Sequence, residues 1–317
     1  MRGKHWAGVA AVALLLGAGG LLYRPALAAN PWGADYFPNV PLTTQDGTTV
    51  NFYDDLLKGK AVAINLIYTS CTDECPLETA RLVQVQRLLG DRVGKDLFFY
   101  SISIDPTRDT PAVLKAYAEK FGVGPGWLFL TGKADDIKLI AKKLGLSRRS
   151  DAANRDGHMA LLMLGNEPTG QWMRNSAVDN PNFLATTISR FLGWPSQEPG
   201  RSYAELTQPP TIDAGAYLFQ SRCAACHTVG KGDAVGPDLA GVTTRRARAW
   251  LVEYLRAPEQ MLAAQDPIAI ALAAQYKSVP MPNLRLSNNE IAMVLSFLEA
   301  QGRASPQHAG QDSASSR

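Results

Sequence analysis

The sequence predicts an α/β domain followed by a smaller all-α domain. Its 317 residues correspond to about two domains. Between residues 34 and 194, short apolar runs alternate with helical patterns, whereas only helical patterns follow residue 211. The intervening segment, 195–210, contains four prolines among polar residues and is typical of a linker.

The composition is that of a globular chain able to bury a core, with 46% hydrophobic and 19% charged residues. A formal net charge of +3 gives no concentrated basic character, so we expect no nucleic-acid partner. Four cysteines are too few for a fold built on disulfides, but they fall into two close pairs far apart in the chain.

The N-terminal segment, 1–28, predicts the compartment. Basic residues precede an uncharged apolar run at 6–23, and the small-x-small sequence Ala26-Leu27-Ala28 follows. This order is typical of a secretory signal peptide. At about 18 residues the run is also long enough to span a bilayer, so cleavage and retention as a membrane anchor both stay open. We expect a periplasmic protein that contacts the membrane only through this segment if it is retained.

The first elements expected are a β-hairpin and a buried strand. Asp46-Gly47 separates two β-prone runs, 42–44 and 49–52, and Asp-Gly favours a tight hairpin turn. Residues 61–68 form a nearly continuous apolar run, as expected for a strand buried on both faces. The segment 77–89 then has a broad apolar face at helical spacing.

The rest of this domain continues the alternation of strand and helix. A helix is expected to open at Asp109-Thr110-Pro111, where a capping residue precedes proline. Further strands are expected at 97–104, 127–130 and 159–164, and a further helix near 134–144. Apolar strands that alternate with helices predict a sheet carrying helices on both faces.

The second domain, 211–302, is expected to contain helices at 213–222, 244–256 and 288–300. Ser287 and Glu290 have the spacing of a capping box at the start of the last helix. The tail, 303–317, has no large apolar residue, and we expect it to be disordered.

The second cysteine pair lies in Cys223-Ala224-Ala225-Cys226-His227, the C-x-x-C-H pattern of covalent haem c attachment. Its two thiols can reach the two haem vinyl groups, and His227 can serve as the proximal iron ligand. A disulfide, or half of a zinc site beside a coincidental histidine, is the alternative. No further cysteine follows to complete a zinc set, which favours haem.

Met281 is the expected sixth iron ligand, since it lies between Pro280 and Pro282 in a loop before the last helix. Met293 instead fits the apolar face of that helix, and Met261 is typical of a residue that fills gaps in a core. Ligation by histidine and methionine leaves no open iron position, which suits electron transfer rather than oxygen chemistry.

From residue 213 to 301 the chain resembles class I cytochromes c. The haem motif, Gly236-Pro237-Asp238-Leu239 and the Met281 loop carry this resemblance. It implies that the carbonyl of Pro237 accepts a hydrogen bond from His227 and thereby orients the imidazole. It also implies a close crossing of the first and last helices, with contacts from Gly215, Phe219 and Phe297.

The first cysteine pair, Cys71 and Cys75, follows the strand that ends at Tyr68 and opens a helix. Four-residue spacing places both sulfurs on one face of a helical turn. The helix N-terminus is expected to lower the thiol pKa and give accessible thiolates, suited to disulfide exchange or to a soft metal such as Cu(I). A structural disulfide, a redox pair alone, and a copper site that also cycles between dithiol and disulfide all stay open.

Residues from about 36 to 193 resemble the Sco/SenC family of thioredoxin-like copper proteins. The resemblance is carried by Cys71 to Pro76, Ser103 to Pro106 with Asp109 to Pro111, the segment 114–121, and His158. It implies that Cys71, Cys75 and His158 hold one copper ion. It also implies a role in maturing the dinuclear copper centre of a terminal oxidase, by copper delivery, thiol reduction or both.

Three aspartates accompany these residues in the sequence. Asp105 and Asp109 either lie beside the copper ligands or serve as capping and turn residues. Gly157 separates Asp156 from His158, whereas many relatives join aspartate directly to histidine, and this weakens the transfer of a role to Asp156.

Together these features predict a periplasmic copper metallochaperone or thiol–disulfide protein joined to a haem c electron-transfer domain. Expected partners are the copper-centre subunit of a terminal oxidase or a related copper enzyme, and a periplasmic electron donor or acceptor. The alternatives are a haem-coupled thiol peroxidase acting at Cys71, a copper-independent thiol–disulfide oxidoreductase, and an electron shuttle whose first domain only docks onto a partner.

Overall fold

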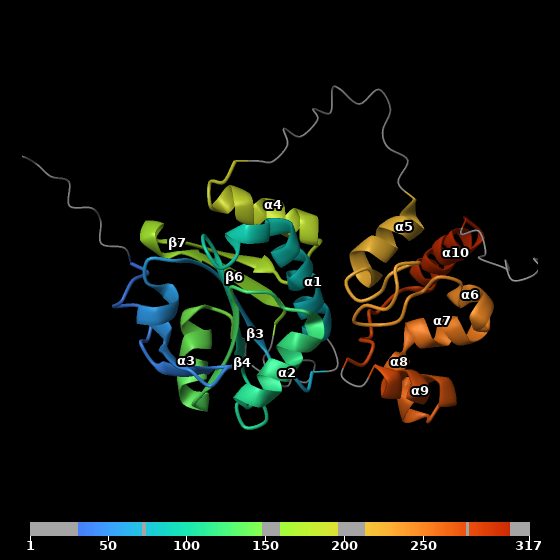
Figure 1. Ribbon diagram of the computed structural model, residues 1–317, viewed down its shortest axis with the longest axis horizontal. Helices are drawn as coiled ribbons and strands as arrows, with labels where there is room; N and C mark the ends of the chain where they lie inside the picture. The colour runs from blue at the N-terminus through green and yellow to red at the C-terminus, as the bar shows by residue number, and fades with distance from the viewer. Residues whose placement is uncertain (1–30, 72–73, 148–158, 196–212, 277–278, 305–317) are drawn as a thin grey trace, which may run out of the picture.

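The computed structural model describes residues 31–71, 74–147, 159–195, 213–276 and 279–304. They form an α/β domain and a helical domain that lie side by side (Figure 1). The predicted signal or anchor segment, most of the linker, and the tail beyond residue 304 lie outside the described residues. Within the described ranges, no helix has the length and apolar character needed to cross a membrane.

A seven-stranded sheet in the order β2-β1-β5-β4-β3-β6-β7 forms the centre of the first domain. Its strands are β1 (Pro41–Thr44), β2 (Thr49–Asn51), β3 (Ala61–Ile67), β4 (Phe98–Ser103), β5 (Trp127–Gly132), β6 (Leu161–Asn166) and β7 (Gln171–Ser176). β3 pairs in parallel with β4 and antiparallel with β6. The hairpin and the apolar strands expected from the sequence are confirmed, although β6 begins two residues later than predicted.

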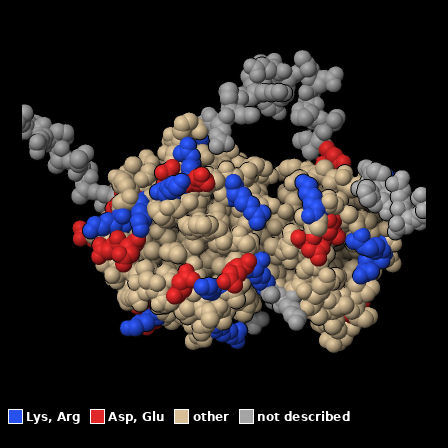
Figure 2. All heavy atoms as spheres, in the orientation of Figure 1, with Lys and Arg blue, Asp and Glu red and all other residues tan. Residues whose placement is uncertain are grey.

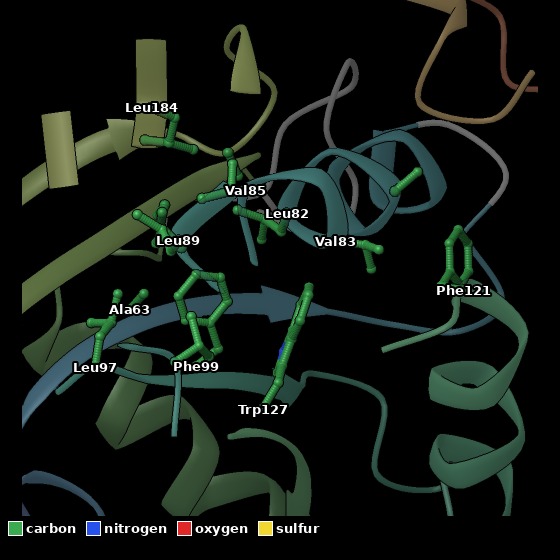
Figure 3. Packing of buried hydrophobic residues seen from close by; sticks show 14 of the residues in the cluster. Ala63, Leu82, Val83, Val85, Leu89, Leu97, Phe99, Phe121, Trp127 and Leu184 are labelled. Atoms are coloured by element: carbon green, nitrogen blue, oxygen red, sulfur yellow. The ribbon is translucent and has the colours of Figure 1, made fainter. Parts of the chain in front are cut away.

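Helices cover both faces of the sheet, as predicted (Figure 1). One face carries α1 (Glu74–Leu89), α2 (Pro111–Phe121) and α4 (Pro181–Phe191), and the other carries α3 (Ala134–Lys143) and a π-helical turn, Phe52–Leu57. Short 3-10 turns occur at Gly90–Arg92 and Glu167–Thr169. Alternate residues of each strand point to opposite faces, so the domain has two cores. Figure 3 shows α1 side chains packed over Phe99 and Trp127 in the first core.

The sequence patterns did not predict β7, α4 or the turn at 52–57. β7 is a sheet edge of mostly half-buried and exposed residues, so it lacks the apolar run that marks the inner strands. α4 does carry a start signal, because Asn180 caps it and Pro181 occupies its first turn.

The second domain is helical, as predicted. Its elements are α5 (Ala214–Leu218), a π-helical turn (Phe219–Cys223), α6 (Val242–Arg245), α7 (Arg248–Arg256), α8 (Pro258–Ala263), α9 (Pro267–Gln275) and α10 (Asn288–Ala304). The helix expected at 244–256 is interrupted at Arg246 and Ala247, whose backbones are extended. The predicted capping box is confirmed, since Ser287 N donates to Glu290 Oε2 at 2.8 Å and Glu290 N donates to Ser287 Oγ at 3.3 Å.

The first and last helices of this domain cross closely. A Cβ atom on Gly215 would lie 2.4 Å from the carbonyl oxygen of Met293, so only glycine permits this approach. The rings of Phe219 and Phe297 lie 5.2 Å apart beside the crossing. The contact residues implied by the resemblance are therefore confirmed.

Charged side chains of both signs are interspersed on the face of the molecule shown in Figure 2. On this face neither domain gathers one sign of charge into a continuous patch.

Candidate functional site

Cys71 and Cys75 lie where β3 passes into α1. Cys71 N donates to the carbonyl of Tyr68 at 3.2 Å, which turns the chain out of the strand. Both residues are thiols, and Cys75 is hydrogen-bonded to Cys71. The local sequence thus places two sulfur atoms side by side at the start of a helix.

This thiol pair is buried, with 5% of Cys71 and none of Cys75 exposed. The hydrogen bond from Cys71 and the loss of solvent both raise the pKa of Cys75 well above its ordinary value. The prediction that the two sulfurs are accessible is therefore wrong for both residues, and the prediction of a lowered pKa is wrong for Cys75.

A chain of buried polar side chains lies beside the pair. Glu78, one turn after Cys75, accepts a hydrogen bond from Asn65 Nδ2 at 2.8 Å. Ser101 Oγ donates to Asn65 Oδ1 at 2.7 Å, and Trp127 Nε1 donates to Ser101 Oγ at 2.9 Å. The sequence analysis missed this network, although a polar residue in each of two apolar strands is a signal for it.

Asp109 anchors the segment that leads to Cys71. Its buried carboxylate accepts hydrogen bonds from Thr69 N at 3.1 Å and from Ser103 Oγ at 2.5 Å, and a further one from the Thr69 hydroxyl. The helix cap at this point is Thr110, which accepts from Val113 N at 3.4 Å. Asp109 thus positions the segment from Thr69 to Cys71.

Asp105 has a more peripheral role. It accepts a hydrogen bond from the Thr107 hydroxyl at 2.7 Å and lies 3.8 Å from the Arg108 guanidinium. It also lines, with Ser70, a cavity of about 930 Å³ beside the start of the cysteine loop.

His158, Asp156 and Gly157 lie outside the described residues. The structure therefore brings together two of the three predicted copper ligands. In the part of the chain that is described, no group of three histidine, cysteine or acidic side chains is arranged to hold a metal ion. Two adjacent thiols are nevertheless a soft donor set, which fits Cu(I) once a third ligand is supplied.

The haem motif follows the π-helical turn that extends α5. The backbone N–H groups of Cys226 and His227 both donate to the carbonyl of Cys223, at 3.0 and 2.9 Å, which closes a tight turn. His227 Nδ1 lies 2.9 Å from the carbonyl oxygen of Pro237, so Nε2 is left for a metal. Burial lowers the pKa of His227, which favours the neutral imidazole that binds iron. A Cβ atom on Gly236 would lie 2.6 Å from His227 Cε1, so this approach requires glycine.

Met281 faces the same space as His227. The two residues line a mainly apolar cavity of about 330 Å³, together with Cys223. Neither Met261 nor Met293 lines it, so Met281 is the methionine placed to bind an iron held by His227. This apolar cavity fits a covalent haem, because a thiol for attachment, an oriented imidazole and a thioether surround it. Tyr254 in α7 and Leu272 in α9 also line the cavity, and the sequence analysis did not identify them.

Comparison with known proteins decides the family. Residues 33–191 match the SCO1/SenC family model. The chain belongs to the SCO1/SenC family. Residues 212–301 match the cytochrome c model, so the fused second domain is a cytochrome c domain, whose cofactor is haem c. The predicted fold class, a thioredoxin-like α/β domain followed by an all-α cytochrome c domain, is confirmed.

The curated relatives match the SCO1/SenC domain only in part. A SCO2-like protein of Rickettsia felis is 36% identical over 102 residues, 32% of this chain and 47% of that protein. The mitochondrial protein SCO2 of Saccharomyces cerevisiae is 36% identical over 103 residues, 32% of this chain and 34% of that protein. The matched segment thus spans half or less of these relatives.

Solved structures of the family resemble the same domain. A copper-bound ScoI from Bradyrhizobium japonicum is 29% identical, covers 48% of this chain and 96% of that chain, and gives a TM-score of 0.40. A SCO1/SenC family lipoprotein from Bacillus anthracis is 26% identical, covers 49% of this chain and 94% of that chain, and gives a TM-score of 0.42.

Proposed function

We propose that the protein is a periplasmic copper chaperone that uses its cytochrome c domain as a source or sink of electrons. Copper is the cargo, held by Cys71, Cys75 and His158 and passed to the copper-centre subunit of a terminal oxidase or a related copper enzyme. The observation that carries the proposal is the pair of adjacent buried thiols at the start of α1. The ScoI of Bradyrhizobium japonicum has copper bound in its solved structure, and a similar protein of Stutzerimonas stutzeri is named as copper-binding.

The number of electrons that the haem transfers fits reduction of copper better than it fits reduction of a disulfide. A haem carries one electron, whereas reduction of a Cys71–Cys75 disulfide takes two electrons and two protons. Conversion of Cu(II) to Cu(I) takes one electron, so a single haem is sufficient. The proposed roles in holding the haem rest on two cavities and on the hydrogen bond between His227 and Pro237. Both cavities are lined by His227, Pro237 and Met281, one of them also by Cys223 and the other also by Cys226.

Peroxidase chemistry at Cys71 has less support. A peroxidatic cysteine must meet peroxide as an accessible thiolate, and Cys71 is buried. Copper-independent thiol–disulfide exchange remains the second candidate, because the two adjacent sulfurs suit it equally. Rapid reduction of a disulfide substrate by the copper-free protein would favour that function.

A Cu(I) competition titration of the haem-loaded protein tests the proposal. We expect one copper per chain, loss of tight binding in Cys71→Ser and Cys75→Ser, and at least tenfold weaker binding in His158→Ala. The matched control is His308→Ala, a histidine in the tail, which should bind copper as the unaltered protein does. Equal affinity in His158→Ala and the unaltered protein would rule out the three-ligand site.

A further inference from the structure

Helix α1 connects the thiol pair to the cytochrome domain. Only 5% of Arg81 is exposed, although arginine is rarely buried without partners. Its guanidinium donates to the carbonyl of Ser221, and Gln84 Nε2 donates to the carbonyl of Ala224 at 2.8 Å. Both acceptors belong to the cytochrome domain, one just before the haem motif and one inside it. The side of α1 that carries these residues therefore faces the haem-attachment turn (Figure 1).

Apolar contacts support these hydrogen bonds. Ala225, Cys226 and Val235 of the cytochrome pack against the core of the first domain, which includes Ala80 and Val83 of α1. A cavity of about 220 Å³ lies where the two surfaces meet, and its lining includes Ala80 and Val83 from α1 and Ala225 and Val235 from the cytochrome domain. The turn of the haem motif, residues 223–227, therefore packs on α1 through both polar and apolar contacts.

Arg81 also places a positive charge at this contact. Burial lowers the pKa of Arg81, and the neighbouring Arg222 lowers it further, while Asp179 acts in the opposite direction. An arginine held here against burial and a like charge places a fixed cation beside the cysteines that attach the haem. Arg81 therefore joins the two domains together with Gln84, since each side chain donates a hydrogen bond from α1 to the cytochrome backbone.

We propose that the face of α1 formed by Arg81 and Gln84 is the junction through which the haem domain and the Cys71–Cys75 site exchange an electron, with Arg81 as its positioning residue. The inference rests on the proposed function, because it requires copper at the thiol pair. Arg81 and Gln84 follow Cys75 by six and nine residues, about 9 and 14 Å along the helix axis. The ferrous haem iron loses one electron and Cu(II) at the thiol pair gains it. No sulfur–sulfur bond forms or breaks, and no proton is transferred.

Flash photoreduction of the haem in the Cu(II)-loaded full chain tests the junction, with haem reoxidation followed by absorbance. In the unaltered protein we expect a reoxidation rate constant that does not depend on protein concentration. Arg81→Glu should slow it at least tenfold, and Arg81→Lys should retain most of it. Ala225→Glu, which alters the contact from the cytochrome side and leaves α1 intact, should slow it similarly. Lys58→Glu, an equal charge reversal on the opposite face of the sheet, is the matched control and should leave the rate unchanged.

Three further measurements separate docking from folding and from copper binding. Circular dichroism should show both domains folded in every variant, and copper affinity should change less than twofold. Small-angle scattering should show a larger radius of gyration in Arg81→Glu and Ala225→Glu. If the domains separate and the reoxidation rate does not change, the electron does not pass through this face of α1. An unaltered protein that binds no copper but stays compact would refute the proposed function and the electron step while leaving the docking intact.

Discussion

At the scale of single residues, burial separates two aspartates that look alike in the sequence. Asp109 is fully buried and accepts hydrogen bonds from the segment leading to Cys71, whereas Asp105 makes its contacts near the surface. Sequence spacing could not assign these roles, because both residues follow the same strand and both have turn-forming chemistry. Only the packing shows which carboxylate supports the copper site.

Asp109→Ala should lower the free energy of unfolding of the first domain by about 3 kcal/mol, since hydrogen bonds to a charged group contribute about 1.5–3 kcal/mol each. It should also weaken Cu(I) binding, because Thr69 loses its anchor. The control, Asp105→Ala, should cost less than about 1 kcal/mol, as exposed ion pairs do. Urea unfolding and copper competition provide both readouts. Equal losses in the two variants would contradict the positioning role of Asp109.

Met281→Ala should open the sixth coordination position of the haem. The reduced protein should then bind carbon monoxide stoichiometrically, and the haem potential should fall, because methionine ligation raises it. Met293→Ala and Met261→Ala are the matched controls and should keep the unaltered spectrum, since neither methionine lines the cavity. Absorption spectroscopy with carbon monoxide distinguishes the three variants. Carbon monoxide binding by Met293→Ala alone would transfer the ligand role to that residue.

At the scale of elements, the sequence predicted best where turn residues or a buried apolar run mark an element locally. The hairpin at Asp46-Gly47 and the apolar run of β3 were found because turn chemistry and strand burial are local signals. α9 was missed although Asp266 caps it and Pro267 opens it, the same signal that identified α2. Its residues are apolar all round, so it shows no helical periodicity. The broad apolar face of α1 was predicted, and it packs in the core of the first domain. The contact of Arg81 and Gln84 with the cytochrome domain is tertiary and left no mark in the local pattern.

Gly215→Ala should destabilise the cytochrome domain by about 1–3 kcal/mol, because the added methyl group would overlap the backbone of α10. Gly302→Ala, in α10 itself, is the control. Outside its own helix, the nearest atom to the added methyl would be the Gly241 Cα at 3.9 Å, so the change should stabilise by up to about 1 kcal/mol through helix propensity. Denaturant unfolding followed at the haem absorption band measures both. Destabilisation by both changes would show that the helix crossing is not the cause.

The loop that carries Pro237 gives a pH-dependent prediction. Burial raises the pKa of Asp238, but N–H groups of Ala240, Gly230 and Gly232 donate to its carboxylate and lower the pKa to about 2. Because the folded pKa lies below the unfolded value, the stabilisation is present above about pH 4 and is lost as the pH falls toward 2. Asp238→Asn should therefore be less stable than the unaltered domain at pH 7 and nearly equal to it at pH 2. A difference that does not change with pH would contradict this role.

At the scale of the whole molecule, the two cysteine pairs have separate environments linked by one helix. Cys71 and Cys75 open α1, and the haem motif is seated on its outer side. Motif spacing predicted both sites and the order of the domains. It could not predict the burial of the thiols or the contact between the domains, since both depend on surfaces that meet only in the folded chain.

We expect Cys71 and Cys75 to hold copper through their sulfur atoms. X-ray absorption at the copper edge of the haem-loaded, Cu(I)-loaded protein measures this directly, because the haem iron does not contribute at that edge. We predict two sulfur neighbours and one imidazole nitrogen per copper ion, with the nitrogen absent in His158→Ala. A copper ion surrounded only by nitrogen and oxygen would contradict ligation by the two cysteines.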